Sequence, residues 1–223
     1  VYGAGVLGSY LAYTLTRAGN DVTVLARNTR LQQLQQDGLR LHHYLQRRDT
    51  TTPVAVRATL PPAARYALIF VVMQYGQFDA VLPQLAANVS TNIVLMGNNM
   101  TPQRMQARLN ALSTTPKHVA FGFQTSAGSR TDDGQVISFH GRGNVMIGEL
   151  QDQRLVYPLV REAFNTQAKV RYQPDIQAWL QTHALYITAM NAVELWHGHD
   201  GPALARDNRA LNEMAQATAE AFA

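Results

Sequence analysis

The chain has 223 residues, a formal net charge of +4 and no cysteine. The length fits one large domain or two ordinary ones, and the lack of cysteine excludes disulfides, thiolate zinc sites and thiol nucleophiles. The 19 Lys and Arg residues are scattered. The modest basic excess therefore favours a small anionic ligand over nucleic acid.

The longest apolar run, residues 67–73, has the length of a strand. No run approaches the roughly 20 residues that a helix needs to cross a bilayer, and no signal peptide is visible. We therefore expect a cytoplasmic protein with no membrane and no nucleic-acid partner. The sequence starts without Met at Val1, inside a strand pattern, and stops at Ala223, inside a helical one. We expect both ends to be incomplete.

The first 150 residues alternate strand and helix patterns. Apolar spacing predicts helices over residues 5–18, 28–37, 78–87 and 101–112. β-Branched and apolar runs predict strands over residues 1–2, 21–26, 39–44, 53–58, 67–73, 92–96, 119–123, 135–139 and 144–147, with a polar loop between the third and the fourth. This alternation predicts an α/β fold with a mostly parallel sheet and helices on both faces.

After about Glu149 the pattern becomes mainly helical. It predicts a helix over residues 152–164, a short strand over 169–172, a long helix from Pro174 and a last helix over 202–222. A junction between two domains is expected near residues 149–173.

Residues 3–8 read Gly-Ala-Gly-Val-Leu-Gly, between a strand pattern and a helix pattern. In that context Gly3 permits a tight turn, Gly5 lets the backbone approach a pyrophosphate, and Gly8 lets the helix lie close to the strand. The helix N-terminus, with Val6 and Leu7, presents free N–H groups to phosphates. The alternative is a glycine-rich turn with no ligand.

The end of the second predicted strand indicates which dinucleotide is bound. A carboxylate there would bind the ribose 2′-hydroxyl of NAD, but residues 26–30 read Ala-Arg-Asn-Thr-Arg. Arg27 and Arg30 suit a 2′-phosphate, because a guanidinium makes charge-assisted bonds to phosphate. The sequence therefore predicts NADP(H) as cofactor. The alternative is that both arginines are surface charges.

Further short segments follow in a fixed order: Met-Gly-Asn-Asn-Met at 96–100, Gly-Arg-Gly at 141–143, Ile-Gly-Glu-Leu at 147–150 and Asp-Ile-Gln-Ala at 175–178. With the glycine motif and Arg27, this set resembles the ketopantoate reductase (2-dehydropantoate 2-reductase) family over nearly the whole chain. The resemblance implies a Rossmann domain, a helical domain and an active site in the cleft between them. It implies NADPH-dependent reduction of a 2-oxo acid to a 2-hydroxy acid, as in pantothenate synthesis.

We therefore expect residues 1–150 to form a Rossmann-type NADP-binding domain. Residues 151–223 are expected to form an all-helical domain for substrate binding or dimerisation, incomplete at its C-terminus. Such a domain makes a homodimer one possible assembly, and a small 2-oxo acid is the expected substrate.

The chain departs from the pattern of the family that it resembles. The family's proton-donating lysine on the long helix aligns with His183, and an asparagine one turn later aligns with Ile187. The next asparagine is retained as Asn191, and spacing by four places these positions on one helix face. A lysine after the third apolar strand aligns with Gln74, a cofactor-binding position. Asn98 is retained as a contact to cofactor or substrate.

His183 and Asn98 are therefore the catalytic candidates, although His183 could equally be a core histidine. Glu194 lies about three helical turns after His183, and is either a substrate-binding acid or a solvated charge. His197 and His199, with Asp200 next, could hold a metal. We favour a polar loop and predict no metal site, because no further ligand is obvious.

Three functions remain open at this point. The first is an NADPH-dependent reductase of a 2-oxo acid. The second is an NADPH-binding regulator without turnover, suggested by the changes at His183, Ile187 and Gln74. The third is an NADP-dependent hydroxy acid dehydrogenase of another type with the same two-domain plan.

Overall fold

The computed structural model describes residues 1–141, 144–198 and 201–222. Arg142 and Gly143 of the Gly-Arg-Gly segment, and His199 and Asp200 of the polar loop, lie outside these ranges. The chain forms two compact units, Val1–Gly97 with Thr101–Ile176 and Asn98–Met100 with Gln177–Ala223. Contacts place residues 151–176 in the first unit. The roles predicted for residues 1–150 and 151–223 stay predictions.

The main sheet of the first unit has five strands in the order β11-β10-β7-β6-β5. They are β5 (Ile69–Val72), β6 (Asn92–Met96), β7 (His118–Gln124), β10 (Asn144–Glu149) and β11 (Lys169–Tyr172). Strands β5, β6 and β7 are parallel, and β10 and β11 are parallel to each other. Only the pairing of β10 with β7 is antiparallel within this sheet. The predicted α/β fold with a mostly parallel sheet is confirmed.

Tyr2, the residue before the glycine motif, joins this sheet to a two-stranded parallel sheet. It forms parallel β-bridges to Leu25 on one side and to Val71 on the other. Leu25 ends β1 (Thr23–Leu25), which pairs with β4 (Ala55–Arg57). The first predicted strand thus lies between β1 and β5, as a Rossmann fold requires.

Helices cover both faces of the main sheet. They are α1 (Val6–Arg17), α3 (Phe78–Ala87), α4 (Pro102–Leu112) and α5 (Tyr157–Phe164), whereas α2 (Asn28–Asp37) contacts β4. Val94 and Met96 of β6 share one core with buried residues of α1 and α5. Ile93 and Leu95 are also fully or nearly fully buried but point to the opposite face, since side chains alternate along a strand. Buried side chains of α3 and α4 supply cover there, as predicted.

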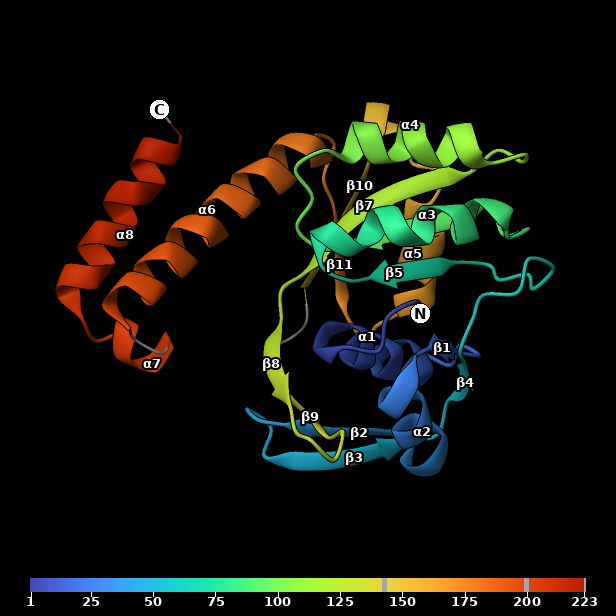
Figure 1. Ribbon diagram of the computed structural model, residues 1–223, viewed down its shortest axis with the longest axis horizontal. Helices are drawn as coiled ribbons and strands as arrows, with labels where there is room; N and C mark the ends of the chain where they lie inside the picture. Colours follow the sequence, from blue (N-terminus) through green and yellow to red (C-terminus); the bar gives the residue numbers. More distant parts are fainter. Residues whose placement is uncertain (142–143, 199–200, 223) are drawn as a thin grey trace. The chain divides into compact units, whose positions relative to one another are not determined.

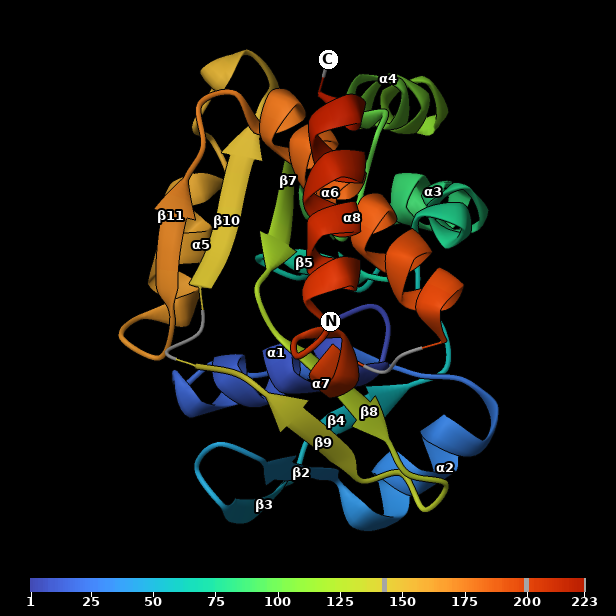
Figure 2. The same cartoon turned by 90° about the vertical axis from the view of Figure 1, so that its left-hand side faces the viewer.

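A second sheet, which the sequence did not predict as such, lies across α1. It has the order β3-β2-β9-β8, with β2 (Leu39–His43), β3 (Arg48–Thr52), β8 (Ala127–Arg130) and β9 (Val136–Phe139). Figures 1 and 2 both show α1 between this sheet and the main one. The expected polar loop after β2 is wrong, because β3 pairs with β2 as an exposed, polar edge strand.

Two buried histidines lie where this second sheet meets α1. His43 of β2 is 0 % exposed, and its Nδ1 lies 2.9 Å from Nε2 of His140. The other nitrogen of each ring contacts a hydroxyl: Thr50 at 2.8 Å and Tyr10 at 2.9 Å. Burial, more than the neighbouring His140, lowers the pKa of His43 to about 4. Burial also lowers the pKa of His140, so both rings are neutral at pH 7.

The helix expected over residues 152–164 is wrong at its start. Residues Leu150–Asp152 form a short 3₁₀ turn, η2, and α5 begins only at Tyr157. The buried carboxylate of Glu149 accepts hydrogen bonds from the backbone N–H groups of residues 155–157 at 2.7–2.9 Å. These bonds hold the intervening loop and delay the helix, because they replace helical partners for those N–H groups.

The second unit contains α6 (Ile176–His197), α7 (Gly201–Leu204) and α8 (Asn208–Ala221). A small hydrophobic core contains Val193 of α6, Leu204 at the end of α7 and Ala210 of α8. The single helix expected over residues 202–222 is wrong. Asp207 breaks it by accepting hydrogen bonds from the N–H groups of the following turn, which makes it the N-cap of α8.

No helix in the described ranges combines the length and apolar character that a membrane crossing requires.

Candidate functional site

The glycine motif forms a tight turn in which two of the three glycines have no room for a side chain. Gly3 has φ +112°, and a Cβ there would overlap the carbonyl of Val72. A Cβ on Gly8 would overlap the carbonyl oxygen of Gly3 and lie 3.5 Å from Cβ of Val72. The helix α1 therefore starts in direct contact with the turn and with β5, as predicted for these two positions.

Gly5 differs from the other two glycines. Its φ is −71°, and no heavy atom lies within 4 Å of a Cβ built there. Side-chain volume at Gly5 would project into open space that a ligand could fill. The structure therefore fits a group that approaches this backbone closely, which is the role predicted for Gly5.

The N-terminus of α1 faces the same space. Its first backbone hydrogen bond runs from Ser9 to Gly5 at 2.9 Å, so the N–H groups of Val6, Leu7 and Gly8 precede the helical ladder. The first turn of α1 contains no acidic residue. These N–H groups and the helix dipole create a site for negative charge. The residues present fit a pyrophosphate.

Arg30 does not have the role predicted for it. Its guanidinium is buried and donates to Ala4 O at 3.1 Å, Gly134 O at 2.7 Å and Ser9 Oγ at 3.0 Å. Burial lowers its pKa to about 10. A guanidinium engaged on these partners holds the glycine turn against the β8–β9 loop. Arg30 is therefore a structural residue of the turn, and its prediction as a phosphate ligand is wrong.

Arg27 has the exposure that Arg30 lacks. It lies directly before α2, and its Nη2 donates to Tyr2 Oη at 2.9 Å. The same hydroxyl donates to Gln84 Oε1 at 2.5 Å. No carboxylate among the described residues lies within salt-bridge distance of Arg27, so its charge is available to an anion. Sequence reasoning missed Tyr2 and Gln84; a tyrosine inside a buried strand was the available signal.

Gln74 follows β5 after one intervening residue and is exposed. It caps the short 3₁₀ turn η1 (Tyr75–Gln77), and its N–H donates to Gln77 Oε1 at 3.2 Å. The glycine turn follows Tyr2, Arg27 follows β1, and Gln74 follows β5. Because these three segments run parallel, their carboxyl ends lie along one edge of the sheet, where ligands bind in folds of this kind.

Asn98 belongs to the second unit with its neighbours Asn99 and Met100. Its side-chain Oδ1 is buried and makes no hydrogen bond within the described part of the chain. The carbonyl of Met100 accepts a hydrogen bond from Gln181 of α6 at 3.2 Å. The Asn98 segment is therefore tied to α6, and an unsatisfied acceptor at Asn98 is the kind of group that a ligand's donor would satisfy.

The remaining predicted residues lie along α6, also in the second unit. His183 is half-buried, and its ring stacks on Trp179 with centroids 5.1 Å apart. Burial lowers the pKa of His183 below 6.5. Asn191 is exposed and Glu194 is half-buried.

The described residues contain no group of three or more His, Asp or Glu side chains arranged to hold a metal ion. His197 instead contacts Glu213 of α8, with Nε2 2.6 Å from Oε2. This contact ties the end of α6 to α8.

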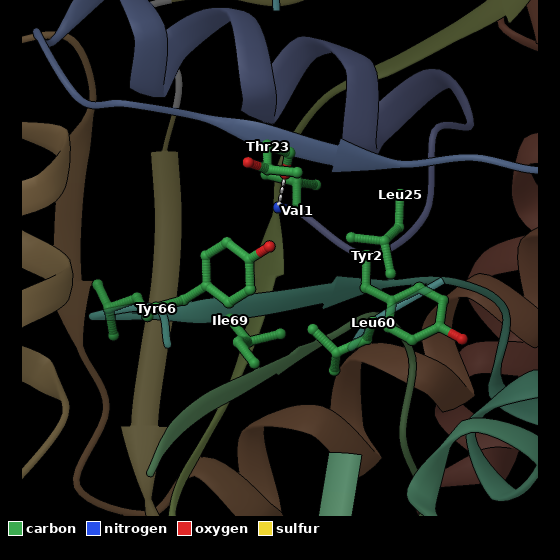
Figure 3. A pocket seen from close by; sticks show the side chains of 8 residues that line it. Val1, Tyr2, Thr23, Leu25, Leu60, Tyr66 and Ile69 are labelled. Carbon is green, nitrogen blue, oxygen red and sulfur yellow. Dashed lines mark hydrogen bonds between the residues drawn. The ribbon is translucent and has the colours of Figure 1, made fainter. Parts of the chain in front are cut away.

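A pocket that the sequence did not predict lies beside β1 and the start of β5 (Figure 3). It has an empty volume of about 250 Å³, which includes open solvent. Its lining consists of Val1, Tyr2, Thr23, Leu25, Leu60, Tyr66, Leu68 and Ile69. Figure 3 shows the Tyr2 ring beside Leu60, with its hydroxyl directed away from Val1 and Thr23. Tyr2 therefore connects this pocket to Arg27.

A parallel strand, a glycine turn and a helix N-terminus, followed by an arginine after the next strand, define an α/β fold of the Rossmann class with features that fit a dinucleotide. Comparison of the sequence with family models identifies the family to which the chain belongs. The sequence model of the family described as Ketopantoate reductase PanE/ApbA matches residues 1–152, and the chain belongs to this family.

Solved structures show the same fold. The 2-dehydropantoate 2-reductase from Geobacter metallireducens GS-15 has a TM-score of 0.81 at 18% identity, covering 99% of this chain and 72% of that one. A PanE/ApbA family ketopantoate reductase from Ralstonia eutropha JMP134 has a TM-score of 0.77 at 20% identity, covering 99% and 71%. D-mandelate dehydrogenase in its ternary structure with NADH and anilino(oxo)acetate has a TM-score of 0.80 at 16% identity, covering 96% and 68%. No curated protein matches the chain.

Proposed function

We propose that this protein is an NADPH-dependent reductase of a small 2-oxo acid, of the 2-dehydropantoate 2-reductase type. The observation that carries the proposal is the turn at residues 3–8, where Gly5 faces open space at the N-terminus of α1. Membership of the ketopantoate reductase family supports the reaction class. The neighbour solved with NADH supports a nicotinamide cofactor.

The cofactor is assigned to residues of the sheet edge. Gly3 and Gly8 shape the turn, and the N–H groups of Val6 and Leu7, with the backbone of Gly5, hold the pyrophosphate. Arg27 provides the charge for a 2′-phosphate, which selects NADPH over NADH. Gln74 and Asn98 are assigned to further polar contacts with the cofactor.

The substrate is assigned to residues of the second unit. Bound NADPH supplies the hydride that a carbonyl carbon accepts. In its imidazolium form, His183 donates a proton to the carbonyl oxygen, and Asn98 donates a hydrogen bond from its amide NH₂ as negative charge develops there. Asn191 and Glu194 bind polar groups of the substrate.

The lowered pKa of His183 sets the pH at which it can act as the acid. Only the imidazolium form carries the proton to be donated, and its population falls as the pH rises through that lowered value. The proposed reductase is therefore most active on the acid side of pH 6.5.

A regulator that binds NADPH without turnover is the second candidate. Two substitutions on α6 favour this candidate. At the positions that align with a lysine and an asparagine of the family, this chain has His183, which is weakly basic, and Ile187, which has no polar group. A homodimer and a cytoplasmic location stay predictions.

Purified protein mixed with NADPH and a panel of 2-oxo acids, including ketopantoate, separates these candidates. Consumption of NADPH with any panel member supports the reductase. Saturable NADPH binding with no consumption across the panel rejects the reductase in favour of the regulator. Substitution of His183 by Ala distinguishes turnover at this site from a contaminating activity.

A further inference from the structure

We propose that Tyr2 and Gln84 form a hydrogen-bond relay that orients Arg27 toward the 2′-phosphate of NADPH. Tyr2 is then a positioning residue that determines the preference for NADPH over NADH. The inference rests on the proposed function, since it concerns the same cofactor.

The direction of the relay follows from the chemistry of its three groups. A guanidinium can only donate, so Arg27 Nη2 donates to Tyr2 Oη at 2.9 Å. The hydroxyl proton of Tyr2 is then directed to Gln84 Oε1 at 2.5 Å. Because the hydroxyl accepts from Arg27 and donates onward, the amide oxygen of Gln84, rather than its NH₂, must face Tyr2. Each group satisfies the next, and the chain has one consistent direction.

The relay starts from a rigid base. Tyr2 is 5 % exposed, and its backbone bridges to both Leu25 and Val71. Gln84 lies on α3, on a different element from both Tyr2 and Arg27. A tyrosine hydroxyl fixed by a strand and by a helix is a stationary acceptor for an otherwise mobile side chain.

The relay leaves most of the guanidinium available. Arginine has five N–H donors, and the bond to Tyr2 uses one donor of Nη2. A free, exposed arginine must lose rotamer freedom when it binds a phosphate. Tethering one nitrogen of Arg27 removes part of that loss in advance, so the remaining donors meet the 2′-phosphate at lower entropic cost.

A structural role for Tyr2 is the competing explanation, because Tyr2 also lines the pocket shown in Figure 3. The two explanations separate at the hydroxyl. Tyr2→Phe keeps the ring in the pocket and removes only the acceptor for Arg27. Tyr66→Phe is the matched control, since Tyr66 lines the same pocket and makes no side-chain bond to Arg27.

The experiment measures dissociation constants for NADPH and NADH by fluorescence titration, on the full chain and five variants. These are Arg27→Ala, Tyr2→Phe, Gln84→Leu, Gln84→Glu and Tyr66→Phe. Adenosine 2′,5′-bisphosphate and adenosine 5′-phosphate repeat the comparison without the nicotinamide. Thermal unfolding of each variant confirms that it is folded.

We expect Tyr2→Phe to weaken NADPH binding about tenfold and to leave NADH binding within about twofold, because one charge-assisted contact is misplaced. Gln84→Leu should shift the same ratio in the same direction, and Gln84→Glu should restore it, because a carboxylate still accepts from Tyr2. Tyr66→Phe should leave the ratio unchanged.

Equal weakening of both cofactors by Tyr2→Phe would make Tyr2 a structural residue only and overturn the relay. An unchanged ratio in Tyr2→Phe, when Arg27→Ala loses the preference, would overturn the relay and leave the assignment of Arg27 intact. A wild-type chain with no preference for the 2′-phosphate would overturn both the relay and the choice of NADPH.

Discussion

Substitution of Gly5 by Ala separates ligand binding from folding more sharply than any other change in the glycine turn. The new methyl group meets no protein atom within 4 Å, and φ −71° suits alanine. Alanine is a poorer N-cap than glycine by about 0.5–1 kcal/mol, and it gains about 0.4–1 kcal/mol by restricting the unfolded chain. The free energy of unfolding should therefore change by less than about 1 kcal/mol.

The effect of the same methyl group on ligand binding should be large. It projects into the space assigned to the pyrophosphate, so NADPH binding should weaken at least about tenfold, or 1.4 kcal/mol. Gly8→Ala adds the same methyl group but should act on folding, because its Cβ would overlap the carbonyl oxygen of Gly3. That variant should lose roughly 3 kcal/mol of stability through overpacking.

The assay pairs denaturant unfolding with NADPH titration for both variants. We expect a stable Gly5→Ala protein with weak binding and a destabilised Gly8→Ala protein. Wild-type affinity in a folded Gly5→Ala protein would refute the placement of the pyrophosphate at this turn.

Three further predictions follow from the same structure. His183→Ala should reduce turnover by orders of magnitude. His183→Lys should extend activity to higher pH, because the ordinary pKa of lysine lies about four units above that of histidine, and burial lowers both. A pH–rate profile with unchanged turnover in either variant would remove His183 from the reaction. Arg30→Ala should lower the free energy of unfolding by on the order of 3 kcal/mol, because it removes a buried guanidinium with three partners. Arg27→Ala should lower it by less than about 0.5 kcal/mol. Equal losses for the two variants in urea unfolding would contradict the two roles. Burial lowers the folded-state pKa of His43 to about 4, so the contribution of His43 to stability should be complete above about pH 6.5 and should be lost between pH 6.5 and 4, by on the order of 3 kcal/mol. His140 adds in the same direction. The check is the difference in stability between the wild type and His43→Gln in urea unfolding; a difference that does not change across this pH range would contradict the buried pair.

The parts of the fold predicted correctly are those with a strong local signal. The strand over residues 92–96 and the helix over 78–87 agree with β6 and α3 to the residue. In each case the apolar pattern matches a buried face, so local sequence and tertiary burial favour the same structure. The turn at Gly3 and Gly8 was predictable for a similar reason, because only glycine fits such close contacts.

The parts that were missed depend on distant partners. The strand β3 is polar and gains its structure from pairing with β2, which no local period reveals. Arg27 and Arg30 look equivalent in sequence. Only the fold brings Ser9 and Gly134 around one of them and leaves the other exposed. The tyrosine in the first strand could be noticed in the sequence, but its pairing with Arg27, 25 residues away, depends on the fold.

Calorimetric titration of NADPH into the intact protein tests the central claim most directly. The account predicts one saturable site per chain, with weaker binding of NADH. A sample that is folded by circular dichroism, yet gives no saturable heat with either coenzyme at millimolar concentration, would contradict it.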